Sequence, residues 1–198
     1  MVVDVRIGIF LFDDVEELDW VGPWEVFGVW ARRWPDDEVE VLSLARSTRP
    51  VRCANGLRAL PDRSWDAVDT LDVLVYPGGQ GTRRQLADDE LFAWLHKRHD
   101  SGTLMASVCT GALVYAAAGL LRDRPATTHW RSLDLLAELD PSIAVRGGER
   151  FVDDGDVVTS AGVSAGIDMA LHLLGRLSSR ERAAEVRRHL QYDPTPVG

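Results

Sequence analysis

The stretch that decides the fold is Leu104-Met105-Ala106-Ser107-Val108-Cys109-Thr110-Gly111-Ala112, continued by Leu113-Val114-Tyr115-Ala116-Ala117-Ala118. The apolar run over residues 104–107 predicts a buried strand, and residues 111–118 predict a helix directly after it. Gly111 and Ala112 are small enough to allow a sharp turn between the two. This order is that of a nucleophile elbow, in which the residue at the turn, here Cys109, projects from the edge of a sheet.

The elbow suggests that Cys109 is a reactive thiol. The N-terminus of the following helix faces the sulfur, so its free N–H groups are expected to lower the thiol pKa and to raise the thiolate fraction. The alternative is a small buried core residue, which is the common fate of a free cysteine. The strand, turn and helix around Cys109 favour the reactive thiol. Cys53 lies beside a hairpin turn with no helix after it, and we interpret it as structural.

Outward from the elbow, strands and helices alternate along the chain. We expect a helix starting at Pro23 after a Gly22 cap, a hairpin turning at Asn55-Gly56, and helices capped by Asp88 and by Ser178 or Ser179. The expected strands are residues 7–12, 39–44, 71–76, 104–107, 126–128, 143–145, 150–153 and 157–159, and the expected helices are residues 20–34, 89–100, 111–118, 130–139, 165–177 and 179–189. The alternation predicts one α/β domain over residues 1–198, a three-layer α/β/α sandwich around a mostly parallel sheet.

The carboxyl ends of parallel strands hold the chemistry of such folds, which draws attention to Tyr76-Pro77-Gly78-Gly79. This segment ends the strand expected before the elbow strand. The backbone N–H groups of Gly78 and Gly79 are candidates for an oxyanion site beside the sulfur, with a simple turn as the alternative.

Composition excludes several classes of function. The chain of 198 residues carries 22 basic and 31 acidic side chains, a formal charge of −9, and no Lys/Arg-rich run, which disfavours a nucleic-acid partner. No apolar stretch approaches the roughly 20 residues that cross a bilayer. We see no signal peptide after Met1, and two cysteines are too few for a disulfide framework, so we expect a cytoplasmic protein.

The histidines do not form a metal-ligand grouping. His96, His99, His172 and His189 are spread over expected helices, so neither a metal nor a cofactor is expected. His129 ends the strand expected at 126–128. It is either close enough to favour the thiolate electrostatically or a structural hydrogen-bonding residue.

Several segments together resemble the ThiJ/PfpI superfamily, and within it the isonitrile hydratase (isocyanide hydratase) branch. They are Leu18-Asp19-Trp20-Val21-Gly22-Pro23, Tyr76-Pro77-Gly78-Gly79, Ser107-Val108-Cys109-Thr110-Gly111-Ala112, Ala117-Ala118-Gly119-Leu120-Leu121 and Ala126-Thr127-Thr128-His129-Trp130. The resemblance extends from Arg6 to Pro194. It implies a flavodoxin-like domain, usually a homodimer, with the elbow cysteine as nucleophile and an acidic residue from the loop after the first strand beside it.

The resemblance places that acid on Asp19, within the Leu-Asp-x-x-Gly-Pro motif, and also matches Thr110. Peptidase members carry a histidine directly after the cysteine, and Thr110 at that position argues against a Cys-His peptidase. A carboxyl beside a thiolate has a raised pKa and can carry a proton near neutral pH, whereas the alternative role of Asp19 is helix capping. Thr110 either orients the substrate or sulfur through its hydroxyl or simply packs at the start of the helix.

The function that this resemblance implies is hydration of an isonitrile, a small-molecule substrate, to an N-substituted formamide through a thioimidate on Cys109. Two alternatives remain: a glyoxalase or deglycase acting on small aldehydes, and a free-standing ligand or redox sensor related to the N-terminal domain of transcription regulators. The chain ends at Gly198, where no helix-turn-helix module is expected.

Aromatic residues crowd the expected helix at residues 20–34. They are Trp20, Trp24, Phe27, Trp30 and Trp34, and the apolar positions of this helix cover two faces. Because one core needs only one face, we expect a homodimer contact through this helix.

Overall fold

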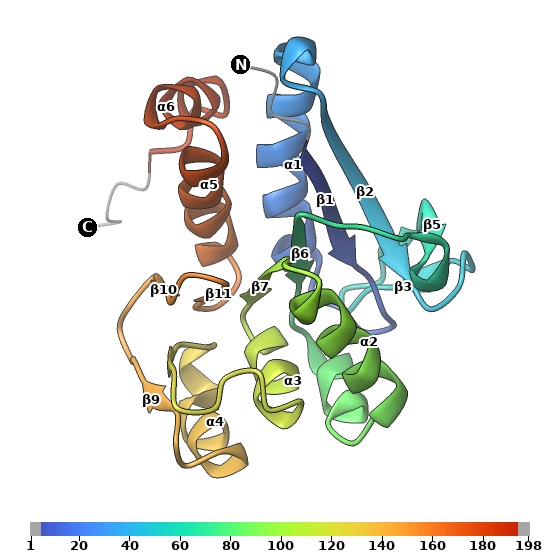
Figure 1. The fold of residues 1–198 in the computed structure, drawn as a ribbon, viewed down its shortest axis with the longest axis vertical. Helices are drawn as coiled ribbons and strands as arrows, with labels where there is room; N and C mark the ends of the chain where they lie inside the picture. Colours follow the sequence, from blue (N-terminus) through green and yellow to red (C-terminus); the bar gives the residue numbers. More distant parts are fainter. Residues whose placement is uncertain (1–4, 194–198) are drawn as a thin grey trace.

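The protein is described by a computed structural model that covers residues 5–193 (Figure 1). Met1, where no signal peptide is expected, and Pro194, at the end of the family resemblance, lie outside these residues. The strands of the main sheet are β1 (Val5–Phe10), β2 (Val39–Ala45), β5 (Arg63–Ser64), β6 (Val73–Tyr76), β7 (Leu104–Val108), β10 (Phe151–Asp153) and β11 (Val157–Ser160). Their order is β10-β11-β7-β6-β1-β2-β5. All neighbours pair in parallel except β10 and β11.

Two short sheets and a set of helices complete the described fold. The short sheets pair β3 (Val51–Arg52) with β4 (Arg58–Ala59), and β8 (Pro125–Ala126) with β9 (Ala144–Val145). The α-helices are α1 (Glu17–Arg33), α2 (Asp89–Asp100), α3 (Gly111–Ala117), α4 (Leu133–Leu139), α5 (Ala165–Leu177) and α6 (Arg180–His189). The 3-10 helices are η1 (Pro35–Asp37), η2 (Trp65–Ala67), η3 (Gln80–Gln85) and η4 (Trp130–Ser132).

The sheet separates two hydrophobic cores, which confirms the flavodoxin-like three-layer fold. Along β1, Ile7 and Ile9 face a core built with α1 and α5, while Phe10 faces the opposite core with α2 and α3. Both faces of the parallel strands are therefore buried, as their continuous apolar runs predict. Helices α1 and α5 lie side by side on one face (Figure 1).

Capping and turn predictions are confirmed at several ends. The Asp88 carboxylate accepts the N–H of Leu91, and the Ser179 hydroxyl accepts the N–H of Arg182. The hairpin between β3 and β4 turns with Gly56 at φ 97°, a conformation that favours glycine. The edge strand β5, only two residues long, was not predicted.

The start of α1 corrects the sequence prediction. The helix begins at Glu17 rather than at Pro23, so Gly22 is not its cap and Pro23 lies inside it. Glu17 and Asp19 occupy the first turn, where acidic side chains interact favourably with the helix dipole. Asp19 is therefore neither a cap nor a loop residue, and the helix fixes its side chain.

The strand predicted at residues 126–128 is also displaced. β8 covers Pro125–Ala126 and pairs with β9 outside the main sheet. After Ala126 the chain is held by hydrogen bonds to side chains instead of by strand pairing. The Thr127 N–H donates to Thr159 Oγ1, and the Thr128 hydroxyl donates to the carbonyl of Cys109. The helix expected at 130–139 is split into η4 and α4.

The second apolar face of α1 has partners within the chain. α1 packs against α5 and α6, and the Arg182 guanidinium lies 4.2 Å from the centre of the Trp34 ring. This packing buries part of the apolar surface that was expected to form the homodimer contact. The homodimer stays a prediction. No helix within residues 5–193 has the length and apolarity needed to span a bilayer.

Candidate active site

Cys109 occupies a strained turn directly after β7. Its φ is 56°, in the left-handed region that only glycine adopts at no steric cost. Its N–H donates to the carbonyls of Ser160 and Ala161, at 3.2 Å each. A side chain at Gly111 would place Cβ 2.2 Å from the carbonyl oxygen of Tyr76, which explains the small residue there. The expected elbow is thus present in the backbone.

The buried carboxyl of Asp19 reaches the elbow from the first turn of α1. Its side chain is fully buried, and Oδ2 accepts the N–H of Gly78 at 2.9 Å. Oδ1 is buried without a hydrogen-bond partner of good geometry among the described residues. Burial raises the pKa of Asp19 to about 7, against the lowering effect of the Gly78 hydrogen bond, and the charge of Glu16 adds to the rise. This carboxyl holds a proton at a pH at which an exposed aspartate does not.

The thiol pKa differs from the sequence prediction. Burial raises the pKa of Cys109 to about 12, and the negative charge of Asp19 adds to the rise. The N–H groups of Thr110 and Val163 act in the opposite direction but are weaker. The expected lowering by the helix N-terminus is therefore outweighed by desolvation and by the neighbouring carboxyl.

Asp19 and Cys109 consequently behave as one titrating pair. The proximity of the thiol lowers the pKa of the carboxyl, and the carboxyl raises the pKa of the thiol. The carboxyl therefore loses its proton before the thiol does, and over the pH range between the two titrations the pair holds one proton. Such a pair can activate a nucleophile and deliver a proton without a separate base.

Gly78 and Gly79 position the site rather than present free donors. The Gly78 N–H is used by Asp19, and the Gly79 N–H donates to the hydroxyl of Thr110 at 2.9 Å. A Cβ at Gly78 would lie 2.5 Å from the Thr110 nitrogen, and one at Gly79, whose φ is 126°, would lie 2.3 Å from the carbonyl oxygen of Asp14. Of the two expected roles, these contacts favour the turn over the oxyanion site, because each N–H already has a partner in this arrangement.

Thr110 lies directly after Cys109 and against the glycine turn. Its hydroxyl also donates to the Gly79 carbonyl at 3.2 Å, and it is nearly buried. The Thr82 hydroxyl approaches it at 3.4 Å. These bonds tie the elbow to the end of β6 and to η3.

A cavity of about 320 Å³ opens over the sulfur. It is lined by Glu16, Ala54, Gly79, Gln80, Arg83, Cys109, Thr110, His129, Arg131, Ser132 and Val163. Its volume suits a small molecule. Within residues 5–193 no group of three or more metal-ligating side chains is found.

His129 lines this cavity, and its contacts favour the second of its two expected roles, that of a structural hydrogen-bonding residue. Partial burial lowers its pKa, and the positive charges of Arg131 and Arg83 lower it further. Its Nδ1 accepts the N–H of Arg131 at 3.3 Å, which leaves the proton on Nε2. No hydrogen bond joins it to Cys109 in the described structure. A neutral imidazole supplies no positive charge to the sulfur.

Sequence reasoning missed Val163, Glu16, Arg83 and Arg131. Val163 has φ 52°, unusual for a β-branched residue, and its N–H lowers the pKa values of both Asp19 and Cys109. It follows β11, whose carboxyl end lies at the same edge of the sheet as the elbow. The position of Val163 after a parallel strand could have indicated a role in the site, because the loops at this edge of a parallel sheet form the binding and catalytic sites.

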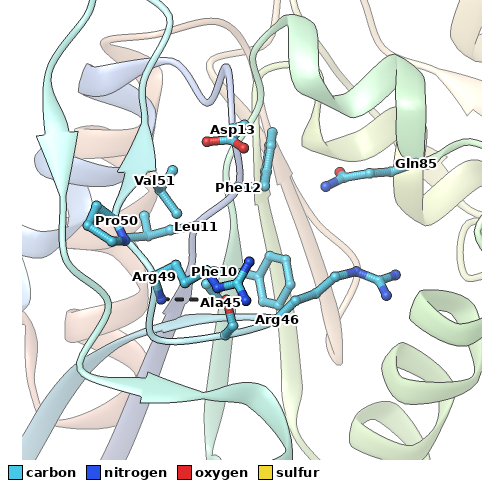
Figure 2. A pocket seen from close by; sticks show the side chains of 11 residues that line it. Phe10, Leu11, Phe12, Asp13, Ala45, Arg46, Arg49, Pro50, Val51 and Gln85 are labelled. Carbon is cyan, nitrogen blue, oxygen red and sulfur yellow. Dashed lines mark hydrogen bonds between the residues drawn. The ribbon is translucent and has the colours of Figure 1, made fainter.

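A second cavity, of about 340 Å³, lies at the ends of β1 and β2 (Figure 2). Phe10, Phe12 and Val51 contribute apolar walls, with Arg46 and Asp13 at the edges (Figure 2). Arg46 is paired with Asp88 and Glu90. Cys109 and Asp19 do not line this cavity. The cavity over Cys109 is therefore the candidate active site.

Comparisons with known proteins agree with this geometry. Isonitrile hydratase of Pseudomonas putida is 36% identical over 192 residues, which are 97% of this chain and 80% of that protein. The transcriptional regulator GbdR of Pseudomonas aeruginosa is 31% identical over 151 residues, 76% of this chain but 41% of the regulator. The crystal structure of a ThiJ/PfpI family protein from Pseudomonas syringae superposes with a TM-score of 0.87 at 31% identity, covering 98% of this chain and 78% of that one.

The match to a family description covers most of the chain and agrees with the resemblance predicted from the sequence. It extends over residues 5–176, from β1 into α5, and includes the elbow, the glycine turn and Asp19. The chain belongs to the DJ-1/PfpI family.

Proposed function

We propose that this protein hydrates isonitriles to N-substituted formamides, with Cys109 as the nucleophile and Asp19 as the proton carrier. The observation that carries the proposal is the left-handed turn that places Cys109 below a cavity of small-molecule size, with the buried Asp19 carboxyl close enough to raise the thiol pKa. The 36% identity with an isonitrile hydratase over nearly the whole chain supports it.

In the first step the sulfur attacks the terminal carbon of R–N≡C. A C–S bond forms, and the single proton of the pair passes through Asp19 to that carbon, giving the thioimidate R–N=CH–S. Asp19 is left ionised. Because it is buried, its proton moves to a neighbouring atom rather than into solvent.

In the second step water attacks the thioimidate carbon. Asp19 takes one proton from the water as the C–O bond forms and passes it to the nitrogen. The remaining hydroxyl proton then goes to Asp19, the C–S bond breaks, and R–NH–CHO leaves. The pair again holds one proton, so the cycle needs no cofactor.

We propose supporting roles for the neighbouring residues in this reaction. Thr110 holds the Gly78-Gly79 turn, and that turn holds the Asp19 carboxyl. The Val163 N–H, which favours the charged forms of both catalytic groups, replaces Gly78 and Gly79 as the proposed donor toward developing negative charge.

The test is formamide formation from a panel of alkyl and aryl isonitriles by the wild type, Cys109→Ala and Asp19→Asn. The proposal predicts turnover by the wild type and loss of turnover in Cys109→Ala. Wild-type inactivity on the whole panel would contradict it. Turnover of methylglyoxal instead would favour a glyoxalase.

A ligand sensor is the second candidate, because the chain matches part of a transcriptional regulator. In that case a small molecule should bind at the Cys109 cavity without being converted. Calorimetry with the same isonitriles and product analysis separate a sensor from an enzyme.

We also propose that the protein is a cytoplasmic homodimer. We expect the dimer contact to involve two side chains of α1, the exposed Leu18 and the partly exposed Trp24. Sedimentation at micromolar concentration should give the mass of two chains, and a monomer would contradict the dimer.

A further inference from the structure

The cavity over Cys109 carries two guanidinium groups, those of Arg83 and Arg131. Neither forms an ion pair with a carboxylate anywhere in the part of the chain that the structure describes. Other arginines do, such as Arg46 with Asp88, Arg124 with Asp156 and Arg84 with Asp14. These two arginines share one cavity with the Cys109 sulfur.

Neutral groups hold the Arg83 guanidinium in place. One nitrogen donates to the carbonyl of Gly79 at 3.2 Å and to the hydroxyl of Thr82 at 3.1 Å, and the other donates to Ser132 at 3.4 Å. These acceptors fix its position without neutralising its charge. The first of them belongs to the glycine turn that holds Asp19, so Arg83 is built into the site.

Arg131, on η4, is also held by a neutral group. Its guanidinium lies 4.7 Å from the centre of the Trp130 ring, and that ring is 68% exposed. The aromatic face orients a cation without an opposing carboxylate. Both arginines are exposed to solvent at the mouth of the cavity, η3 supplying one and η4 the other.

The acids near the sulfur only partly offset these charges. Among the described residues, Glu16 is the one acidic residue that lines the cavity, against two guanidinium groups. The Asp19 carboxyl does not line the cavity, and it accepts the N–H of Gly78. Burial is the main cause of the lowered pKa of His129; the charges of both arginines lower it further, and the charge of Glu16 acts in the opposite direction.

We propose that Arg83 and Arg131 select substrates with a carboxylate remote from the reacting carbon. A carboxylate between two guanidiniums accepts charge-assisted hydrogen bonds, which orient the rest of the molecule toward the sulfur. The inference rests on the proposed function, because it names the substrate class of the same site. It makes both arginines specificity-determining residues.

The first test compares an ω-isocyano carboxylate with its primary amide, which has nearly the same size and no charge. The wild type should prefer the carboxylate in kcat/KM by about 10-fold, mainly through KM. Arg83→Gln and Arg131→Gln should each reduce this preference to about 3-fold or less, and the double variant should abolish it. Arg84→Gln is the matched control, since Arg84 is the next residue and pairs with Asp14.

Equal turnover of both isonitriles by the wild type would overturn the inference. An equal loss on both substrates in the arginine variants would do the same, because it would show a structural role. If neither isonitrile is hydrated, the proposed function fails, and a second readout still tests the charge selection.

That readout is the rate of Cys109 alkylation by iodoacetate relative to iodoacetamide, followed by mass spectrometry of the Cys109 peptide. The two reagents differ in one carboxylate, and the reaction needs no isonitrile. The ratio should fall by about 5-fold or more in Arg83→Gln/Arg131→Gln and stay unchanged in Arg84→Gln. An unchanged ratio in the double variant would contradict anion selection whether or not isonitriles are substrates.

Discussion

Cys109 and Cys53 are the two cysteines of the chain, and both are free and buried. Burial raises the pKa of both thiols. Cys109 sits in a left-handed turn at the carboxyl edge of the sheet, against the Asp19 carboxyl and below a cavity. Cys53 is part of the β3–β4 turn, where its N–H donates to the carbonyl of Leu57.

The difference teaches that burial alone does not make a thiol functional. Around Cys53 the charges of Glu17, Asp13 and Glu16 only add to the rise in its pKa, and the Trp20 side chain opposes it. Cys109 lies near a buried carboxyl whose charge raises its pKa, and it borders a cavity in which a substrate can reach it. In the proposed function, a proton acceptor and an open approach therefore distinguish Cys109 from a core residue.

The largest expected effect is the loss of turnover on removal of Cys109, with removal of Cys53 as the control. Cys109→Ala should lower kcat for isonitrile hydration by about 10³-fold or more, because no other group can form the thioimidate. Cys53→Ala should change kcat by less than about 2-fold. Steady-state formamide formation measures both. Comparable losses in the two variants would break the distinction between them.

The next effect concerns the pH dependence of stability. Folded Asp19 keeps its proton to about pH 7, whereas its unperturbed pKa is 3.8. Between these values the unfolded chain binds fewer protons, so the free energy of unfolding should fall as the pH rises, by about 4 kcal/mol in all. Urea unfolding from pH 4 to pH 8 should show this fall in the wild type and in Cys53→Ala but not in Asp19→Asn. Parallel curves for the wild type and Asp19→Asn would mean that the carboxyl is ionised throughout.

The effect of Asp19 on catalysis is expected to be smaller. Asp19→Asn should reduce kcat by about 100-fold, since the amide can neither accept the thiol proton nor deliver one. Wild-type kcat/KM should rise as the pH increases through about 7, where the pair loses its first proton. The variant should lack this rise. A pH profile that keeps it would assign the titration to another group.

Sequence reasoning predicted the elbow and the alternation of strands and helices because both depend on short-range patterns. The apolar runs of β1, β6 and β7 and the small residues after Cys109 are local signals. The start of α1 could not be predicted in this way, because Asp19 is held by Gly78, 59 residues away in the chain. Tertiary contacts of this kind override the local preference for Pro23 at a helix start.

The roles within the site were harder to predict than its location. The thiol pKa depends on how deeply Cys109 is buried and on the approach of Asp19, and no sequence pattern encodes either. The N–H groups of Gly78 and Gly79 were candidates for an oxyanion site, but they already donate to Asp19 of α1 and to Thr110, the residue before α3. Arg83 and Arg131 belong to short 3-10 helices that periodicity did not resolve.

The smallest expected effect is the difference in stability between the two cysteine variants. Cys53→Ala removes a buried sulfur from the core and should lower the free energy of unfolding by about 1 kcal/mol. Cys109→Ala should cost less, because its side chain borders an open cavity and Ala leaves no closed void. Denaturant unfolding of both variants at pH 5 measures the two values. A larger destabilisation by Cys109→Ala would show that this side chain is chiefly a packing residue.

The central claim is that Cys109 and Asp19 share a proton, and the pH dependence of Cys109 alkylation tests it most directly. In the wild type the rate with iodoacetamide should rise through about pH 7, as the pair becomes singly protonated and Asp19 can accept the thiol proton. In Asp19→Asn this rise should be absent, and reactivity should increase only at much higher pH. The same rise near pH 7 in both proteins would contradict the claim.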